Sequence, residues 1–360
     1  MVKQSSQTLF YKDKPLFGFD IGSNTLKVVE IEQEPKKKSK IVGYGVAEFD
    51  AAAIKDGVII DFEVLALAAK ELFEKGIIGK VTTRRAVATI PASKAYSRVM
   101  TVPAKLSRKE LRDAVYFEAE QYIPIPVDDL YLDYVMAQKK GEDQELMVVA
   151  VPKAIVDSYM KFFELIGIEV CALETTISAA SRMISATENS HDVPTILIDL
   201  GQLAVDITVF DKNLVVNGMI PGGGDDLSKR IAEKLGVSLE EANSLKTKYG
   251  LGVSKKQAEI REALKPQLDS LIKEIRRSVR YYEERSGGKN TVGQIITMGG
   301  GANMPGLVDY LTDNLRIATR KCDFWVSYSM NKLQPPHEAE RSLYVTAAGS
   351  AILPPEEIWK

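Results

Sequence analysis

Two segments of the chain, one near its start and one near its middle, carry the same short pattern. In each, an apolar run ends in an acid and a glycine: Asp20-Ile21-Gly22 in the first copy and Asp199-Leu200-Gly201 in the second. A further apolar run follows at residues 26–31 and 205–210, so the pattern predicts a β-hairpin with a glycine at its turn in both places. One such hairpin is ordinary. Two related hairpins predict two similar half-domains that face each other across a cleft and hold phosphates between their turns.

The composition is that of a globular protein without a nucleic-acid partner. At 360 residues the chain is long for one core, so two lobes or more are expected. Its 47 Lys and Arg residues nearly balance 49 Asp and Glu residues, so no basic field for nucleic acid is expected. No apolar run approaches the ~20 residues of a membrane span, and residues 1–14 lack the apolar core of a secretory signal. The sequence therefore predicts no direct membrane insertion. The two cysteines lie far apart in the sequence, which favours a reducing, cytoplasmic compartment. The two histidines are isolated, which disfavours a histidine-based metal site.

The first glycine turn carries groups suited to phosphate. Glycine at position 22 lets backbone N–H groups approach an anion closely. Asp20 ends its strand and is suited to hold the water shell of Mg²⁺, which keeps several waters when it binds nucleotide phosphates. Asp199 is expected to do the same from the second copy. Further donors and a positive charge surround the first turn: Ser23, Asn24, Thr25 and Lys27. A single copy would favour a plain β-turn with an acid before it, whereas two copies together with two further glycine-rich turns favour a phosphate-binding cradle.

Two other glycine-rich segments are candidates for the nucleoside. The run Gly222-Gly223-Gly224 opens a predicted helix, and Gly299-Gly300-Gly301-Ala302 follows an apolar strand at residues 294–298. A purine or ribose could lie flat against such backbone, and a tight strand-to-helix connection is the alternative in each case. Lys246 lies on a helix that Ser238 is expected to cap. It is a candidate for the ribose or adenine edge, against the alternative of a solvated surface lysine.

Between the two hairpins, residues 88–168 follow a strand–helix–strand–strand–helix pattern that has no counterpart after the second hairpin. Within it, Ser107-x-x-Glu110 predicts a capping box at the start of the first helix. Later in the chain, Pro266 is expected to start a long helix, and small residues within 343–353 predict a closely packed one. We therefore expect a small α+β subdomain inserted into the first lobe. The expected division is 1–87 for the first lobe, 88–168 for the insertion, 169–195 for the return to the first lobe, 196–335 for the second lobe, and 336–360 for a C-terminal helix packing on the first lobe.

Together these loops resemble those of the actin, Hsp70 and sugar-kinase superfamily. In that resemblance residues 20–23 are the first phosphate loop, residues 199–202 the second and residues 299–302 the adenosine loop. The insertion resembles that of the FtsA/PilM family, most closely its PilM branch, through residues 90–103 and the segment Glu118-Ala119-Glu120-Gln121-Tyr122-Ile123-Pro124-Ile125-Pro126. The resemblance covers about residues 15–353. It implies an α/β fold of the actin-like, ribonuclease H-like class, duplicated into two lobes, with a small inserted α+β subdomain.

The same resemblance implies a function. It predicts a cytoplasmic ATP-binding scaffold of the type IV pilus or competence machinery, using Mg²⁺ and recruited to the inner face of the cytoplasmic membrane. Its expected partners are the cytoplasmic N-terminal peptide of a PilN-type inner-membrane protein and other pilus assembly proteins. In the family that peptide lies in a groove between the insertion and the rest of the first lobe. Residues 116–125 could serve this groove or the subdomain core, and the core is favoured. The sequence leaves self-association open.

The second loop departs from the family pattern. Relatives usually continue it with hydroxyl side chains, whereas Gly201 and Gln202 are followed here by apolar residues. Each lost hydrogen bond to a charged phosphate could cost about 1.5–3 kcal/mol. Asn243 also stands where related proteins often have Glu, while Lys246 is kept. We therefore expect nucleotide binding to persist and hydrolysis to be weak, so the chain is at most a weak ATPase.

Other readings stay open at this point. A small-molecule kinase of the same superfamily needs a carboxylate base in the cleft, and the one candidate, Asp206, has a direction that the sequence does not decide. An FtsA-like division protein would anchor itself with an amphipathic C-terminal helix, which the short acidic stretch 354–360 does not predict. A Rossmann dehydrogenase is disfavoured because a second hairpin strand follows the first turn instead of a helix.

Overall fold

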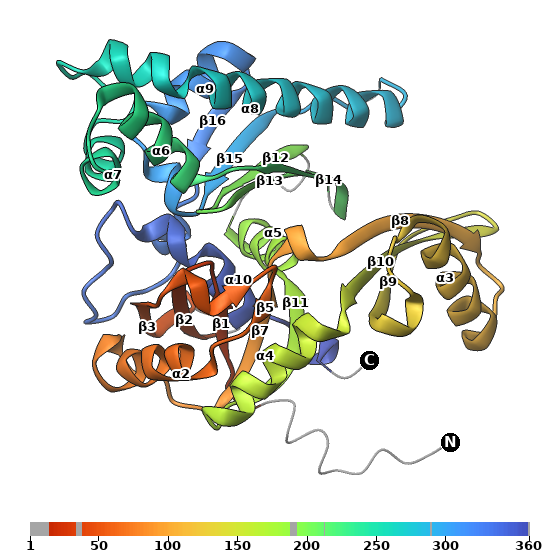
Figure 1. Cartoon of the computed structure of the whole chain (residues 1–360). Coiled ribbons are helices and arrows are strands. Elements are labelled where there is room, and N and C mark those ends of the chain that lie inside the picture. Colours follow the sequence, from red (N-terminus) through yellow and green to blue (C-terminus); the bar gives the residue numbers. More distant parts are fainter. Residues whose placement is uncertain (1–13, 34–37, 188–192, 212, 289, 359–360) are drawn as a thin grey trace.

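The computed structural model describes residues 14–33, 38–187, 193–211, 213–288 and 290–358. Two lobes are stacked on each other, and a smaller subdomain projects sideways from the first lobe (Figure 1). In the described part of the chain, no helix is both long enough and apolar enough to cross a membrane.

The two lobes are built on the same sheet. In each, an antiparallel three-stranded meander continues through its first strand into two parallel strands, which gives the orders β3-β2-β1-β7-β11 and β14-β13-β12-β15-β16. A short strand extends the first sheet beyond β3. The strands of the first lobe are β1 (Phe17–Ile21), β2 (Thr25–Glu32), β3 (Lys40–Glu48), β6 (Ile77–Gly79), β7 (Arg85–Ile90) and β11 (Glu169–Thr175). Those of the second lobe are β12 (Thr195–Leu200), β13 (Ala204–Asp211), β14 (Asn213–Pro221), β15 (Gln294–Met298) and β16 (Ala318–Lys321). The matching order confirms the predicted duplication.

Two small-residue helices, α5 (Thr176–Thr187) and α10 (Val345–Ala351), lie between the two sheets (Figure 1). One hydrophobic cluster joins their buried faces to residues of both lobes, including Val29 of β2 and Met298 of β15. A Cβ on Gly349 would lie 1.9 Å from the carbonyl oxygen of Ala179, so glycine is needed where these helices touch. The predicted small-residue helix therefore forms the middle layer of the molecule.

The outer faces of both sheets are covered by further helices. On the first lobe these are α2 (Phe62–Glu71) and α4 (Lys153–Leu165), and the second lobe carries α6 (Gly224–Leu235), α7 (Leu239–Lys248), α8 (Gln257–Arg285) and α9 (Leu307–Leu315). The expectation that Pro266 starts a helix is wrong, because α8 begins nine residues earlier and Pro266 lies inside it. Buried side chains on both sides of this proline, Ile260, Leu264, Leu268 and Leu271, share the face that packs on the second sheet.

The inserted subdomain is a three-stranded antiparallel sheet of order β8-β10-β9, with one helix packed on it. Its elements are β8 (Tyr96–Pro103), α3 (Arg108–Tyr122), β9 (Leu130–Lys140) and β10 (Asp143–Pro152). The predicted capping box of Ser107 and Glu110 is present in both directions. Helix α4, which the sequence pattern grouped with the insertion, buries Phe162 and Phe163 among the first-lobe residues around Phe19. Judged by packing, α4 is part of the first lobe.

Candidate functional site

The first hairpin turn is closed by the N–H of Gly22, which donates to the carbonyl of Thr25 at 2.8 Å. Just before this turn, Asp20 is buried and makes two strong contacts. Lys27 Nζ donates to Asp20 Oδ2 at 2.6 Å, and Thr89 Oγ1 donates to Asp20 Oδ1 at 2.6 Å. Both partners come from neighbouring strands, since Asp20 is paired with Lys27 across the hairpin and with Thr89 on the parallel strand β7. The first acid of the site is therefore neutralised within its own lobe.

The second hairpin has the same turn, but its acid is paired with another acid instead of with a lysine. The N–H of Gly201 donates to the carbonyl of Ala204 at 3.0 Å. The residue paired with Asp199 across the hairpin is another acid, Asp206, and its parallel neighbour on β15 is Met298. Burial, aided by the Asp20 carboxylate and opposed by Lys27, raises the pKa of Asp199 to about 6. Burial and the Asp199 carboxylate raise the pKa of Asp206 to about 7.

Because of this difference, the cleft contains two neighbouring acids, Asp199 and Asp206, without a basic side chain paired to them across the hairpin. At matching positions, the first hairpin has a lysine and the second has an aspartate, although the backbone turn is the same. Asp206 Oδ1 is buried and has no hydrogen-bond partner in the described part of the structure. A cation would complete this pair, since buried carboxylates require a counter-charge or a proton. In the described ranges, no group of three or more His, Cys, Asp or Glu side chains could hold a metal ion by itself.

The start of α6 is bound tightly to the second turn. The N–H groups of Gly224 and Asp225 donate to the carbonyls of Gly201 and Gln202 at 3.0 and 3.1 Å. Gln202 Nε2 donates to Asp225 Oδ2 at 3.1 Å. These amides of the helix N-terminus are thus used within the protein.

Lys246 lies against the same helix start and is not a solvated surface lysine. Its Nζ donates to the carbonyl of Gly224 at 2.6 Å and to Ser228 Oγ at 2.8 Å. Ser228 Oγ also lies 3.4 Å from Asn243 Oδ1, so the two residues chosen on α7 meet at one hydroxyl. Burial lowers the pKa of Lys246, and the Asp225 carboxylate opposes this shift.

The glycine run after β15 lies directly against the second turn. Gly299 has a φ of +78°, and a Cβ there would lie 2.3 Å from Asp199 Oδ1. Ser342 fixes the run, because its Oγ donates to the carbonyl of Gly299 at 2.9 Å and its carbonyl accepts the Gly299 N–H at 3.1 Å. An open crevice of about 240 Å³ adjoins the glycine segments, with an apolar wall from α6 and α8. Its glycine lining is Gly201, Gly222, Gly223, Gly224 and Gly301.

The structure thus brings the sequence-predicted residues together in two groups. Asp20, Gly22, Ser23, Asn24, Thr25 and Lys27 lie on the first hairpin, and the remaining candidates lie around the second turn and the start of α6. Sequence reasoning missed Thr89, Ser228 and Ser342. For Thr89 a signal existed, because a strand parallel to β1 and ending at the same edge places a side chain beside Asp20. The direction of Asp206, which the sequence left open, is settled by its pairing with Asp199.

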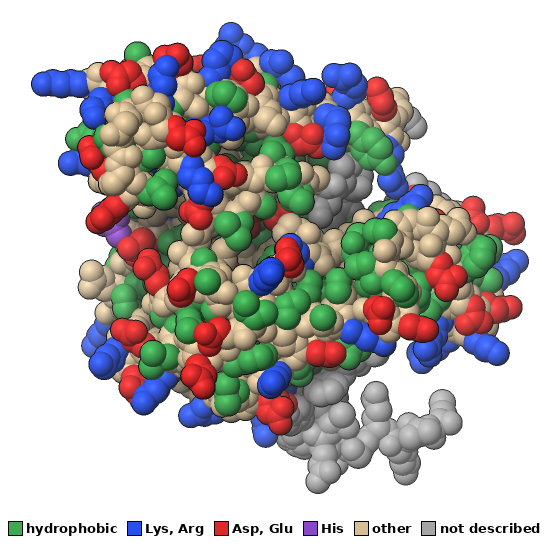
Figure 2. Space-filling view, in the orientation of Figure 1, with side chains coloured by type: hydrophobic (Ala, Val, Ile, Leu, Met, Phe, Trp, Pro, Cys, Tyr) green, Lys and Arg blue, Asp and Glu red, His purple; other side chains and the backbone are tan. Residues whose placement is uncertain are grey.

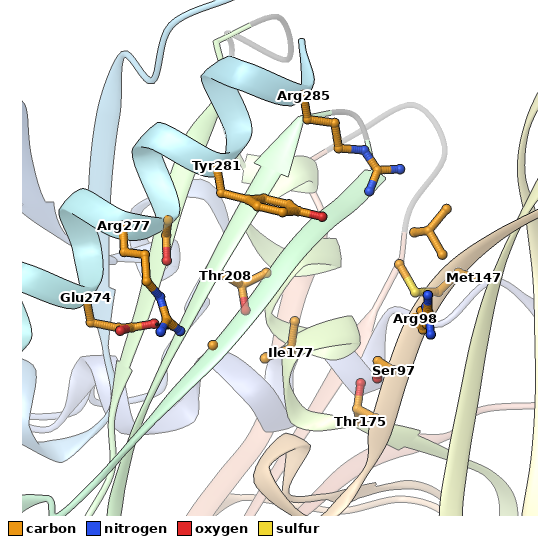
Figure 3. A pocket seen from close by; sticks show the side chains of 13 residues that line it. Ser97, Arg98, Met147, Thr175, Ile177, Thr208, Glu274, Arg277, Tyr281 and Arg285 are labelled. Atoms are coloured by element: carbon orange, nitrogen blue, oxygen red, sulfur yellow. Dashed lines mark ion pairs between the residues drawn. The ribbon is translucent and has the colours of Figure 1, made fainter. Parts of the chain in front are cut away.

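A second concave site lies between the inserted subdomain and the second lobe, where the surface is hollowed (Figure 2). This cavity, of about 560 Å³, is called here the interlobe groove (Figure 3). One side consists of Ser97, Arg98 and Val99 of β8 with Met147 of β10, and Thr175 and Ile177 lie at its base. The other side consists of Thr208, Gly218, Glu274, Arg277, Ser278, Tyr281 and Arg285. The segment 116–125 is not part of this lining. Ala119 and Ile123 are buried in the subdomain core, and Tyr116, Tyr122 and Ile125 pack against them, as favoured from the sequence.

Comparison with known proteins agrees with this architecture. A family model described as type IV pilus assembly protein PilM matches residues 18–353. The cell division protein FtsA of Bacillus subtilis (strain 168) is 23% identical over 346 residues, covering 83% of this chain and 77% of FtsA. A solved PilM-PilN type IV pilus biogenesis complex is similar with a TM-score of 0.81 at 22% identity, over 94% of this chain and 98% of that one. MreB 5 of Spiroplasma citri bound to AMPPNP gives a TM-score of 0.52 at 13% identity, over 94% and 96% of the two chains. The fold is therefore actin-like, and because the family model spans nearly the whole described chain, this chain belongs to the type IV pilus assembly protein PilM family.

Proposed function

We propose that this chain is a nucleotide-holding scaffold of the type IV pilus machinery that docks the cytoplasmic tail of a PilN-type inner-membrane protein. The observation that carries the proposal is an actin-like pair of lobes with a separate subdomain inserted in the first, in a chain of the PilM family. The solved relative with the TM-score of 0.81 is a PilM-PilN complex, which supports a partner of this class. In this proposal the protein is cytoplasmic and reaches the inner face of the membrane through its partner.

ATP with Mg²⁺ is the proposed ligand of the cleft. The first hairpin offers groups for the phosphates, and the second offers carboxylates for Mg²⁺. On the first hairpin, Lys27 Nζ would lie 3.0 Å from a Cβ built on Gly22, so its ammonium group is beside the turn that would meet phosphate. Ser23, Asn24 and Thr25 are partly exposed there and could donate. On the second hairpin, Asp199 and Asp206 could hold the water shell of Mg²⁺, with Asp20 facing them. Bound Mg²⁺ would supply positive charge to the phosphates.

The nucleoside would lie near Gly299–Ala302 and the helix start that Lys246 and Asn243 secure. No hydroxyl of the second turn is available for a terminal phosphate, because residues 203–205 are Leu, Ala and Val. The amides of Gly224 and Asp225 are already bonded to the turn. We therefore propose binding with little discrimination between ATP and ADP, and at most weak hydrolysis.

Calorimetry with ATP and with ADP in the presence of Mg²⁺ tests the nucleotide proposal. We expect both to bind with micromolar affinities within about threefold of each other, since the contact that would separate them is worth about 1.5–3 kcal/mol where it exists. Steady-state hydrolysis should be close to the protein-free rate. If neither nucleotide binds at high micromolar concentration, the proposal of nucleotide binding is wrong. Rapid turnover of ATP would contradict the proposal of weak hydrolysis.

Capture of a synthetic tail peptide tests the docking proposal. The full chain should bind the N-terminal cytoplasmic peptide of the PilN-type protein of the same organism, and a scrambled peptide of the same composition should not bind. A variant that lacks residues 96–152, joined by a short glycine-serine linker, should lose this binding. Deletion of 88–168 would be a poorer design, because α4 supports the first-lobe core. If the folded deletion variant still binds the peptide, the insertion is not part of the tail-binding site.

A further inference from the structure

We infer that the interlobe groove binds a small anion that carries two or more phosphate groups, at a site separate from the cleft between the two hairpins. The inference does not rest on the function proposed above, since neither the partner's tail nor the cleft takes part in it. It adds a second ligand to the protein, held where the insertion faces the second lobe.

The charge of the groove favours an anion. Its lining contains one carboxylate, that of Glu274, and three guanidinium groups, those of Arg98, Arg277 and Arg285. Arg277 Nη2 lies 2.5 Å from Glu274 Oε1, and Arg98 Nη1 lies 3.8 Å from Oε1 of Glu118, which is outside the lining. Arg285 forms no ion pair with any residue that the structure describes. The lining therefore carries a net positive charge, although the charge of the whole chain is −2.

Two of these arginines lie in one row on α8, with a tyrosine between them. Arg277, Tyr281 and Arg285 are spaced by four residues, so they share one face of the helix. The Cα atoms of the two arginines are about 12 Å apart along the helix axis, and their long side chains can converge on a short chain of phosphates. Figure 3 shows Tyr281 and Arg285 extending from α8 toward the side of the cavity that carries Arg98 and Met147.

The donors and the size of the groove suit a phosphate chain. A guanidinium group binds phosphate through two parallel hydrogen bonds, so three of them can hold an anion with several charges. Three hydroxyl side chains of the lining would add donors, those of Ser97, Thr175 and Ser278. A Cβ on Gly218 would lie 3.2 Å from Glu274 Oε1, so the glycine leaves room beside this carboxylate. The cavity volume of about 560 Å³ lies within the roughly 300–1,000 Å³ of ligand pockets.

Tyr281 separates two sources of such an anion. Its side chain is 50% exposed in the lining, where its ring would stack on a planar base. A nucleoside diphosphate would use both the ring and the arginines, whereas inorganic diphosphate would use the arginines alone. In either case one anion would bridge Arg98 of the insertion and the arginines of the second lobe.

Calorimetry with inorganic diphosphate and with ADP, in EDTA and low salt, tests the inference on the full chain. The groove supplies its own positive charge, so its binding should not need Mg²⁺, whereas the carboxylates of the cleft repel phosphate unless a cation lies between them. The variant Arg277→Gln/Arg285→Gln is expected to bind diphosphate at least tenfold more weakly than the wild type. Arg280→Gln is the matched control, because Arg280 is exposed on the same helix but is not part of the groove lining. It should change the affinity by less than twofold.

Tyr281→Ala distinguishes the two anions. If ADP binds the wild type at least threefold more tightly than diphosphate, and Tyr281→Ala removes this difference, the ligand is a nucleotide. Equal binding of the two anions by the wild type assigns the site to inorganic polyphosphate.

Three results would overturn the inference. The wild type could bind neither anion in EDTA, or the double variant could bind diphosphate as tightly as the wild type. Arg280→Gln could also weaken binding as much as the double variant does, which would mean that any exposed arginine suffices. Binding of ATP with Mg²⁺ at 300 mM salt, where screening weakens the groove, reports the cleft and should be the same in all variants. Failure of the inference would therefore leave the proposed function standing, and thermal melts of all variants confirm folding.

Discussion

Replacement of Asp20 by Ala is expected to lower the free energy of unfolding by about 3–5 kcal/mol, because it leaves a buried ammonium group without its counter-charge. Lys27 is only 7% exposed, and its Nζ lies 2.6 Å from Asp20 Oδ2. The variant also removes the acceptor of Thr89 Oγ1. Urea denaturation in the absence of nucleotide measures the effect.

The double variant Asp20→Ala/Lys27→Met separates charge from shape. It should be more stable than Asp20→Ala alone, since removing both charges also removes the unpaired one. If the losses of unfolding free energy in Asp20→Ala and in Lys27→Met add up to the loss in the double variant, the two charges are not coupled. Asp20→Asn is the variant for nucleotide work, because its amide oxygen can still accept from Lys27 while its NH2 group donates to the Thr89 hydroxyl, which can turn to accept, and the negative charge is gone. Its affinity for Mg²⁺ and ATP should fall if the first turn is assigned correctly, and an unchanged affinity would count against that assignment.

The duplicated hairpins could be predicted from the sequence because their signal is local. An apolar alternation, an acid and a glycine turn specify each hairpin without reference to the rest of the chain. Their repetition then specified the two-lobed fold, and the insertion followed as the segment without a counterpart. The family resemblance added the actin-like class. These features depend on short-range pattern, and the structure has each of them.

The features that the sequence did not predict depend on packing between distant segments. Pro266 reads as a helix start, since proline inside a helix costs about 3 kcal/mol. In α8, buried residues on both sides of it, such as Leu264 and Leu268, offset that cost by packing on the second sheet. Helix α4 follows the insertion directly in sequence, yet its phenylalanines meet Phe19, more than 140 residues away. Likewise, the interlobe groove combines β8 with α8, and no local pattern announces that contact.

The acidic pair of the second hairpin gives the stability of the protein a pH dependence. Burial and Asp199 raise the pKa of Asp206 to about 7, from 3.8. The native state therefore binds a proton more tightly than the unfolded chain, and this group makes stability fall as pH rises from about 4 to about 7. Above pH 7 its full cost is present, and below pH 4 none of it remains.

Asp206→Asn removes this cost while keeping the shape of the side chain, so the variant should be more stable than the wild type at pH 8. A carboxyl pKa moved from 3.8 to about 7 corresponds to roughly 4 kcal/mol at 1.36 kcal/mol per pH unit. Water in the cleft screens part of this, so we expect a gain of about 2 kcal/mol. The difference between variant and wild type should shrink steadily as the pH is lowered to 4, which urea denaturation at each pH measures.

The effect of Mg²⁺ on stability tests whether Asp199 and Asp206 form a cation site. If Asp199 and Asp206 share the water shell of the ion, then Mg²⁺ with ADP at pH 8 should stabilise the wild type more than Asp206→Asn, since the ion supplies the charge that the pair lacks. Leu203→Ala is a control in the same turn, because Leu203 is 58% exposed and carries no charge. It should respond to Mg²⁺ and pH as the wild type does. A gain for Asp206→Asn that is independent of pH would mean that the pKa of Asp206 is the same in the native and unfolded states, and the burial of the acidic pair would then not be the origin of the gain.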